Sequence, residues 1–160
     1  MFARQYPVVA FFVQHIAYYR GLHSKFAEVA AHRDFWRSTC DAHPKLATVS
    51  RCNVFGAESE DLHWRKTPAA EVVDQAAQDF RQRQADHKSV LDFRNTYLAH
   101  LDVHTPFFQS VPDFDPAIQT VFAYQEWVRE LTRPVSLNQP ALSVQYAGWE
   151  REARSVIGLS

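Results

Sequence analysis

Apolar residues recur with helical spacing along almost the whole chain, and this pattern constrains the fold more than any other feature. In the first segment they fall three and four residues apart, which places them on one side of a helix over about residues 7–31. Glycine occurs only 4 times in 160 residues, too rarely for a protein rich in β-hairpins. The sequence therefore predicts an all-α protein.

Prolines and capping residues divide this pattern into further helices. Thr67-Pro68 and Asp115-Pro116 each place a capping residue before a proline that suits the first helical turn. Pro44 is expected to kink or split the second helix, because proline removes a backbone donor. Gly56 is expected to end that helix, and Trp64 to anchor the polar connector that follows. The helices predicted after the first cover about residues 34–55, 67–80, 86–101, 115–133 and 139–157.

Length and charge limit the class of protein. A chain of 160 residues predicts a single domain over residues 1–160. With 17 basic and 18 acidic residues the formal charge is -1, which excludes a generally basic nucleic-acid coat but not a local basic groove. Cys40 and Cys52 lie about 18 Å apart along one predicted helix, too far to form a disulfide. Reduced thiols, and the lack of an apolar run of about 20 residues, predict a cytoplasmic protein that does not enter the membrane.

The informative irregularity lies in the predicted helix from Asp86 to Leu101. At 100° per residue, Arg94 lies near the middle of an apolar arc, and Asn95 and His100 lie on its margins. Burying an unpaired guanidinium costs several kcal/mol, so Arg94 must meet a carboxylate, carbonyl groups or a wet cleft. One interpretation is structural, with the Arg94 stem packed and its head paired to an acid on another helix.

A shared ligand is the alternative interpretation. Arg94 and His100 diverge by about 120° around a straight helix, so they meet at one ligand only along a groove or a dimer seam. A metal site is a third interpretation, because His100 and His104 are four residues apart with Asp102 between them. Asp102 would point away from both histidines on a helix, so no metal is expected.

The segment around Arg94 and His100 resembles a known superfamily. The segment Arg94-Asn95-Thr96-Tyr97-Leu98-Ala99-His100-Leu101-Asp102 resembles the signature of HEPN domains, in which an arginine and a polar residue precede a histidine. The segments Phe35-Trp36, Val54-Phe55-Gly56 and Leu62-His63-Trp64 are similar to the branch associated with abortive-infection proteins of bacteria. The resemblance covers about residues 30–135. It implies a helical bundle, a four-helix core with additional helices, that forms a homodimer with the two motif helices facing one another.

The resemblance also implies an activity. Many HEPN domains are endoribonucleases that need no metal or other cofactor and act as toxins or phage-defence effectors. Carried over to this chain, Arg94 binds the scissile phosphate of RNA, Asn95 orients it and His100 transfers a proton. Asp102 stands where toxins partnered with a nucleotidyltransferase carry tyrosine, which disfavours silencing by modification there. Tyr97 and Asp102 are candidate supporting residues.

The partners follow from the same resemblance. They are RNA, a second copy of the chain, and an antitoxin or defence-system protein. A basic approach for RNA is one interpretation of Arg81, Arg83 and Lys88, but the aspartates interleaved with them are more typical of a mixed, solvated helix face. Other HEPN domains have lost catalysis, so the alternative function is a non-catalytic dimer that binds RNA or protein. The neutral net charge favours that alternative.

Overall fold

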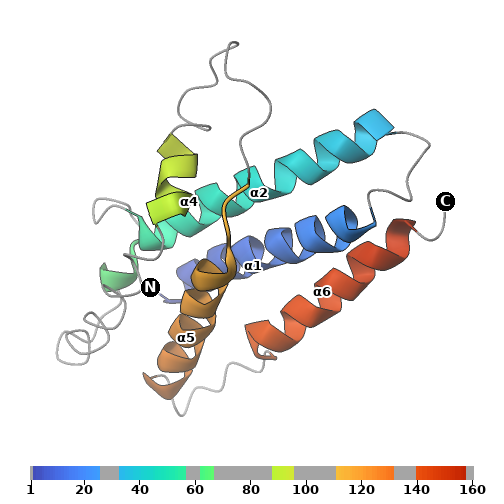
Figure 1. Cartoon of the computed structure of the whole chain (residues 1–160). Helices are drawn as coiled ribbons and strands as arrows, with labels where there is room; N and C mark the ends of the chain where they lie inside the picture. Colours follow the sequence, from blue (N-terminus) through green and yellow to red (C-terminus); the bar gives the residue numbers. More distant parts are fainter. Residues whose placement is uncertain are drawn as a thin grey trace.

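Helices make up the part of the chain that the computed structural model describes, which is residues 2–25, 33–56, 62–66, 88–95, 111–131 and 140–157 (Figure 1). Within these ranges there is no strand, which confirms the all-α prediction for this part of the chain. The α-helices are α1 (Phe2–Ser24), α2 (Arg33–Phe55), α4 (Lys88–Phe93), α5 (Asp115–Leu131) and α6 (Leu142–Ile157), and a 3-10 turn, η2, covers Trp64–Lys66. The predicted helix over 67–80 lies outside the described residues.

Helix α1 is the central element, with α2 and α6 packed along it and α5 against it (Figure 1). Its apolar side chains Val9, Phe12, Val13, Ile16 and Ala17 are completely buried. A helix that contacts neighbours on several sides needs apolar residues around much of its circumference, and α1 has them. One core cluster joins the first four of these residues to side chains of α2, α4, α5 and α6 and to Trp64 of η2.

The predicted bounds of the first helix, 7–31, are wrong at both ends. The helix begins at Phe2, because the residues before Pro7 are anchored by Gln5. The buried Gln5 amide donates to the carbonyl oxygens of Leu62 (3.0 Å) and His63 (3.1 Å). Its own oxygen accepts a 2.7 Å hydrogen bond from the Tyr124 hydroxyl on α5. At the other end α1 finishes at Ser24, whose hydroxyl donates to the Gly21 carbonyl.

Helix α2 runs through Pro44 as a single helix, so the predicted split does not occur. Proline lacks the donor for the preceding turn, but its own carbonyl accepts a 2.8 Å hydrogen bond from the Thr48 hydroxyl. The helix ends before Gly56 as predicted, and Trp64 anchors the following turn at 1% exposure. Cys40 and Cys52 are buried free thiols, which agrees with the geometric prediction that they do not bridge.

The capping of α5 differs in detail from the prediction. The helix begins at Asp115, but the Asp113 carboxylate accepts the hydrogen bond from the Asp115 backbone N–H, at 2.9 Å. Asp115 instead forms a 2.6 Å ion pair with Arg20 of α1. The Arg20 guanidinium also donates to the Tyr146 hydroxyl on α6, at 3.1 Å. Arg20 therefore links α1, α5 and α6.

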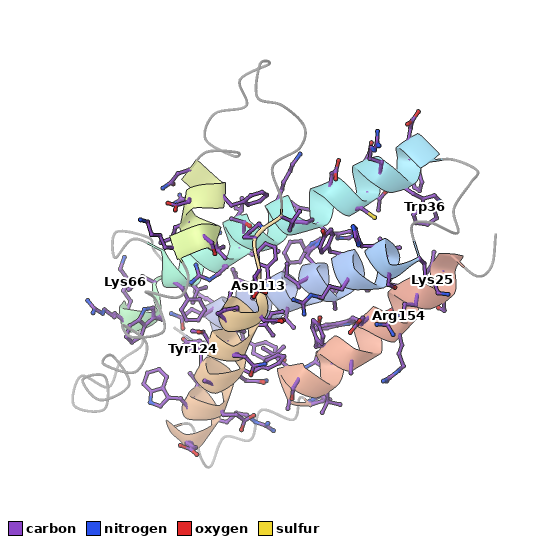
Figure 2. All side chains as sticks on the ribbon, in the orientation of Figure 1. Lys25, Trp36, Lys66, Asp113, Tyr124 and Arg154 are labelled. Atoms are coloured by element: carbon purple, nitrogen blue, oxygen red, sulfur yellow. The ribbon has the colours of Figure 1, made fainter. Side chains whose placement is uncertain are left out.

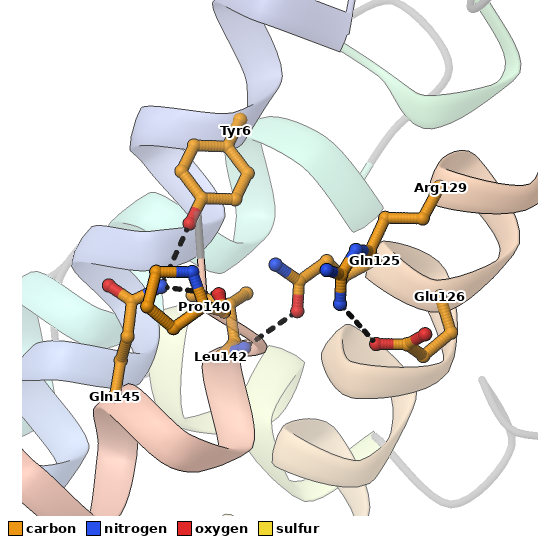
Figure 3. A network of polar contacts seen from close by, with 7 residues as sticks. All are labelled: Tyr6, Gln125, Glu126, Arg129, Pro140, Leu142 and Gln145. Carbon is orange, nitrogen blue, oxygen red and sulfur yellow. Dashed lines mark hydrogen bonds and ion pairs between the residues drawn. The ribbon is translucent and has the colours of Figure 1, made fainter. Parts of the chain in front are cut away.

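Polar side chains also fix the start of α6 (Figure 3). The Leu142 N–H donates to the side-chain oxygen of the buried Gln125, at 2.7 Å. The Gln145 amide donates to the Pro140 carbonyl and to the Tyr6 hydroxyl of α1, at 2.8 and 3.0 Å. These contacts satisfy backbone groups that the first turn of a helix cannot satisfy internally. The predicted start near residues 139–140 is therefore confirmed to within a few residues.

Two glycines test how closely α1 and α6 pack: Gly21 of α1 faces α6, and Gly148 of α6 faces open space. A Cβ added at Gly21 would lie 2.6 Å from the Ala153 Cβ and 2.7 Å from the Glu150 carbonyl oxygen. We expect Gly21→Ala to lower the free energy of unfolding by about 1–3 kcal/mol, because the helices must separate. Gly148→Ala meets no atom within 4 Å, so it should raise stability by about 0.5–1 kcal/mol through helix propensity. Urea unfolding of both variants checks this, and equal stabilisation by the two would refute the close packing.

Candidate functional site

The predicted site residues that the structure describes lie on helix α4 and at the two positions directly after it. Val90 and Phe93 are buried, and Asp92 is exposed, as the predicted apolar arc requires. The winding widens to a π-helical turn at Arg94 and Asn95, immediately after α4 ends. Arg94 is partly buried there and Asn95 is exposed, so Arg94 lies at the edge of the core rather than in its middle. Lys88 is exposed at the start of α4.

The remaining predicted residues lie outside the described ranges: Arg81, Arg83, Tyr97, His100 and Asp102. The predicted helix over 86–101 is confirmed over Lys88–Phe93. The structure therefore brings Arg94, Asn95 and Lys88 onto one short element, and the convergence of Arg94 with His100 stays a prediction. The π-helical turn at Arg94 and Asn95 is of a kind that occurs frequently at functional sites.

A second guanidinium, which the sequence interpretation missed, lies in the core of the bundle. Arg51 of α2 is 1% exposed, and within the described residues no hydrogen-bond partner meets its Nε or NH1. Its guanidinium carbon lies 6.0 Å from the centre of the Phe55 ring, one turn further along α2. Helix α4 packs on α2, so this arginine belongs to the pair of helices that carries Arg94.

The spacing in α2 contained the signal for Arg51. The positions Cys40, Pro44, Ala47, Arg51 and Val54 are separated alternately by four and three residues, which places all of them on one helix face. Four of the five are small or apolar, and the fifth is a charge at the centre of the buried face. The argument that singled out Arg94 applies to Arg51 without change.

Burial of Arg51 is electrostatically unfavourable. Loss of water lowers the pKa of its guanidinium, and the neighbouring Cys52 acts in the opposite direction. Arginine nevertheless keeps its charge in proteins, because its unperturbed pKa is so high. The nearby end of α2 offers some compensation, since the free carbonyl groups of a helix C-terminus carry partial negative charge. A charge held at this cost is a candidate for contact with an anion.

Two histidines form another buried polar contact, between α1 and α2. Their Nδ1 atoms, on His15 and His43, lie 2.6 Å apart, so one nitrogen donates and the other accepts. The Nε2 atom of His15 is buried and has no hydrogen-bond partner among the described residues. A buried lone pair costs less than a buried N–H, which favours the tautomer in which His15 donates from Nδ1. Burial lowers the pKa of both rings, and the charge of His43 lowers that of His15 further, to about 4.

Comparison of the chain with protein-family models, with curated proteins and with solved structures finds no match. Among the described residues, no group of three or more His, Cys, Asp or Glu side chains is placed to hold a metal ion. No helix in that part of the chain is long and apolar enough to cross a membrane.

Replacement of Arg51 tests whether its charge is unpaired. We expect Arg51→Met to raise the free energy of unfolding by about 1–3 kcal/mol, because methionine fills similar space without a desolvated charge. Arg37→Met, at an exposed position of the same helix, is the matched control and should change stability by less than about 0.5 kcal/mol. Denaturant unfolding measures both. A clear loss of stability in Arg51→Met would show that the guanidinium is engaged by a favourable partner.

The histidine pair predicts a pH dependence of stability. Between the ordinary pKa of 6.5 and the lowered value of about 4, unfolded His15 binds a proton that folded His15 excludes. Stability from this group is therefore complete above pH 6.5 and is lost as the pH falls toward 4, by about 3 kcal/mol. The wild type should lose that much more than His15→Gln over this range, whereas His23→Gln, at an exposed site on α1, should follow the wild type. An NMR midpoint for His15 near 6.5 would contradict the argument.

Proposed function

We propose that this protein is a HEPN-type endoribonuclease that needs no metal and acts as a toxin-like or phage-defence effector. The observation that carries the proposal is the position of Arg94. It stands at the edge of the core, at a π-helical turn, directly after the buried residues of α4 and six residues before His100. The all-helical architecture of the described residues is compatible with such a domain. The buried Arg51 on the adjoining helix adds positive charge to this part of the bundle.

The proposed chemistry uses the nucleophile that RNA already contains. A histidine takes the proton from a ribose 2′-OH, and that oxygen attacks the adjacent phosphorus. The bond from phosphorus to the 5′ oxygen breaks, and the leaving oxygen receives a proton, which gives a cyclic phosphate and a 5′-OH. Histidine suits both proton transfers because its unperturbed pKa is near neutral. Arg94 holds the phosphate oxygens through its planar, permanently charged fork, and Asn95 orients them.

A homodimer is part of this proposal, because the reaction needs both a base and an acid. One chain supplies a single His100, and two chains with their motif helices facing each other supply two. The same arrangement removes the geometric difficulty that Arg94 and His100 point in different directions on one helix. The proposed partners are RNA, the second copy, and an antitoxin or defence-system protein.

RNA cleavage in EDTA tests the proposal. Purified protein should cut single-stranded or structured RNA and leave cyclic phosphate ends. Arg94→Ala and His100→Ala should each lower the rate by a factor of about 10²–10⁴, the usual contribution of such groups. Arg94→Lys, which keeps the charge but not the fork, should recover only part of the loss. Arg37→Ala, an exposed arginine elsewhere on α2, is the matched control and should keep full activity.

The same protein samples distinguish the alternative, a non-catalytic dimer that binds RNA or protein. The exposed apolar side chains of α2 favour it, because Phe35, Leu46 and Val49 are 63%, 44% and 45% exposed and lie within about 60° of one another on the helix. In that case no RNA is cleaved although the dimer forms, and Arg94→Ala weakens partner binding while His100→Ala does not. Light scattering measures the dimer, and a gel shift measures RNA binding.

A further inference from the structure

A cavity of about 250 Å³ opens between α1, α2 and α6. Trp36, labelled in Figure 2 near the start of α2, forms one wall, and Tyr18 of α1 and His43 of α2 form others. Leu22 and Val156 add aliphatic surface. This volume is enough for one aromatic ring with a short chain attached, since a cavity of about 150 Å³ already holds benzene.

The described lining of the cavity carries negative charge. Glu152 of α6 is the charged side chain among the described residues that line the cavity. The Tyr18 hydroxyl directs a long, 3.4 Å hydrogen bond at its carboxylate, and Gln14 donates to that hydroxyl at 3.3 Å. The basic residue two positions further along α6, Arg154, pairs with Glu150 instead. Burial lowers the pKa of His43, so its ring adds no positive charge at neutral pH.

We propose that this cavity binds a small organic cation, a primary ammonium group on an aromatic or aliphatic body. The body fills the apolar space between Trp36, Tyr18 and Leu22. The ammonium group meets the Glu152 carboxylate, and the faces of the two aromatic rings attract it further. An anionic ligand of the same shape finds no cation in the described lining and is repelled by Glu152.

This site is separate from the proposed nuclease site. Figure 1 shows α4 beside the C-terminal half of α2, whereas Trp36 and His43 belong to the N-terminal half of that helix. The chemistry of the two sites is also opposite, because guanidinium groups at one end select anions and a carboxylate at the other selects cations. The inference therefore holds or fails independently of RNA cleavage.

Three probes that share a phenyl ring test the inference: 2-phenylethylamine, 2-phenylethanol and 3-phenylpropanoate. Calorimetry on the whole protein should show the amine binding about tenfold more tightly than the alcohol, with the carboxylate weakest. The indole N–H signal of Trp36, assigned in nitrogen-15 NMR spectra with Trp36→Phe, should shift as the amine is added.

Variants test whether Glu152 is the residue that makes the cavity prefer an amine. Glu152→Gln, at an exposed position, should lower the affinity for the amine by about five- to tenfold and leave that for the alcohol unchanged. Glu130→Gln, an exposed carboxylate on α5, is the matched control and should change neither. Val156→Trp should block both ligands by filling the cavity. Equal affinity for amine and carboxylate, an unchanged amine affinity in Glu152→Gln, or no response of Trp36 to any probe would overturn the proposal.

Discussion

The fold depends on the burial of α1 between its neighbours. A central helix gains the most from the hydrophobic effect, but every polar group that it carries must then find a partner within the protein. Gln5 meets this demand fully, since its amide binds the connector at residues 62 and 63 and its oxygen binds Tyr124 of α5. Arg20 meets it at the other end through Asp115 and Tyr146. These two residues therefore fix the positions of the connector at residues 62 and 63, α5 and α6 relative to α1. Apolar contacts alone are not directional and would fix these positions less well.

Arg51 differs from Gln5 and Arg20 in how its buried polar groups are satisfied, and this difference bears on its role. Its Nε and NH1 atoms have no hydrogen-bond partner among the described residues, whereas the polar groups of Gln5 and Arg20 are bonded. Proximity to the C-terminal end of α2 and to the Phe55 ring offsets only part of the cost of desolvation. A stable fold would gain from an apolar residue at this position, so the charge is better explained by something that an arginine does than by packing.

Local rules predicted much of this fold from the sequence, and non-local contacts account for the differences. Helical spacing located α2, α5 and α6, and also the described part of α4, because periodicity is a property of each segment by itself. The start of α1 could not be predicted, since Pro7 resembles a first helical residue until Gln5 is seen bound to residues 62 and 63. Asp115 likewise resembled a cap, but Arg20, 95 positions earlier, pairs with it and leaves the capping to Asp113. For the candidate site, the apolar arc placed Val90 and Phe93 correctly, and Arg51 could have been found by the same test.

The two ends of α2 present opposite chemical surroundings. Near its start lies a cavity with aromatic walls and a carboxylate, and near its end lies the buried guanidinium of Arg51. Between them, His43 contacts His15 across the interface with α1 at 2.6 Å. This short contact is lost when both rings are protonated, since two imidazolium groups at that separation would repel each other strongly. The same His43 ring lines the cavity, so a ligand bound there lies beside the contact that joins α2 to α1.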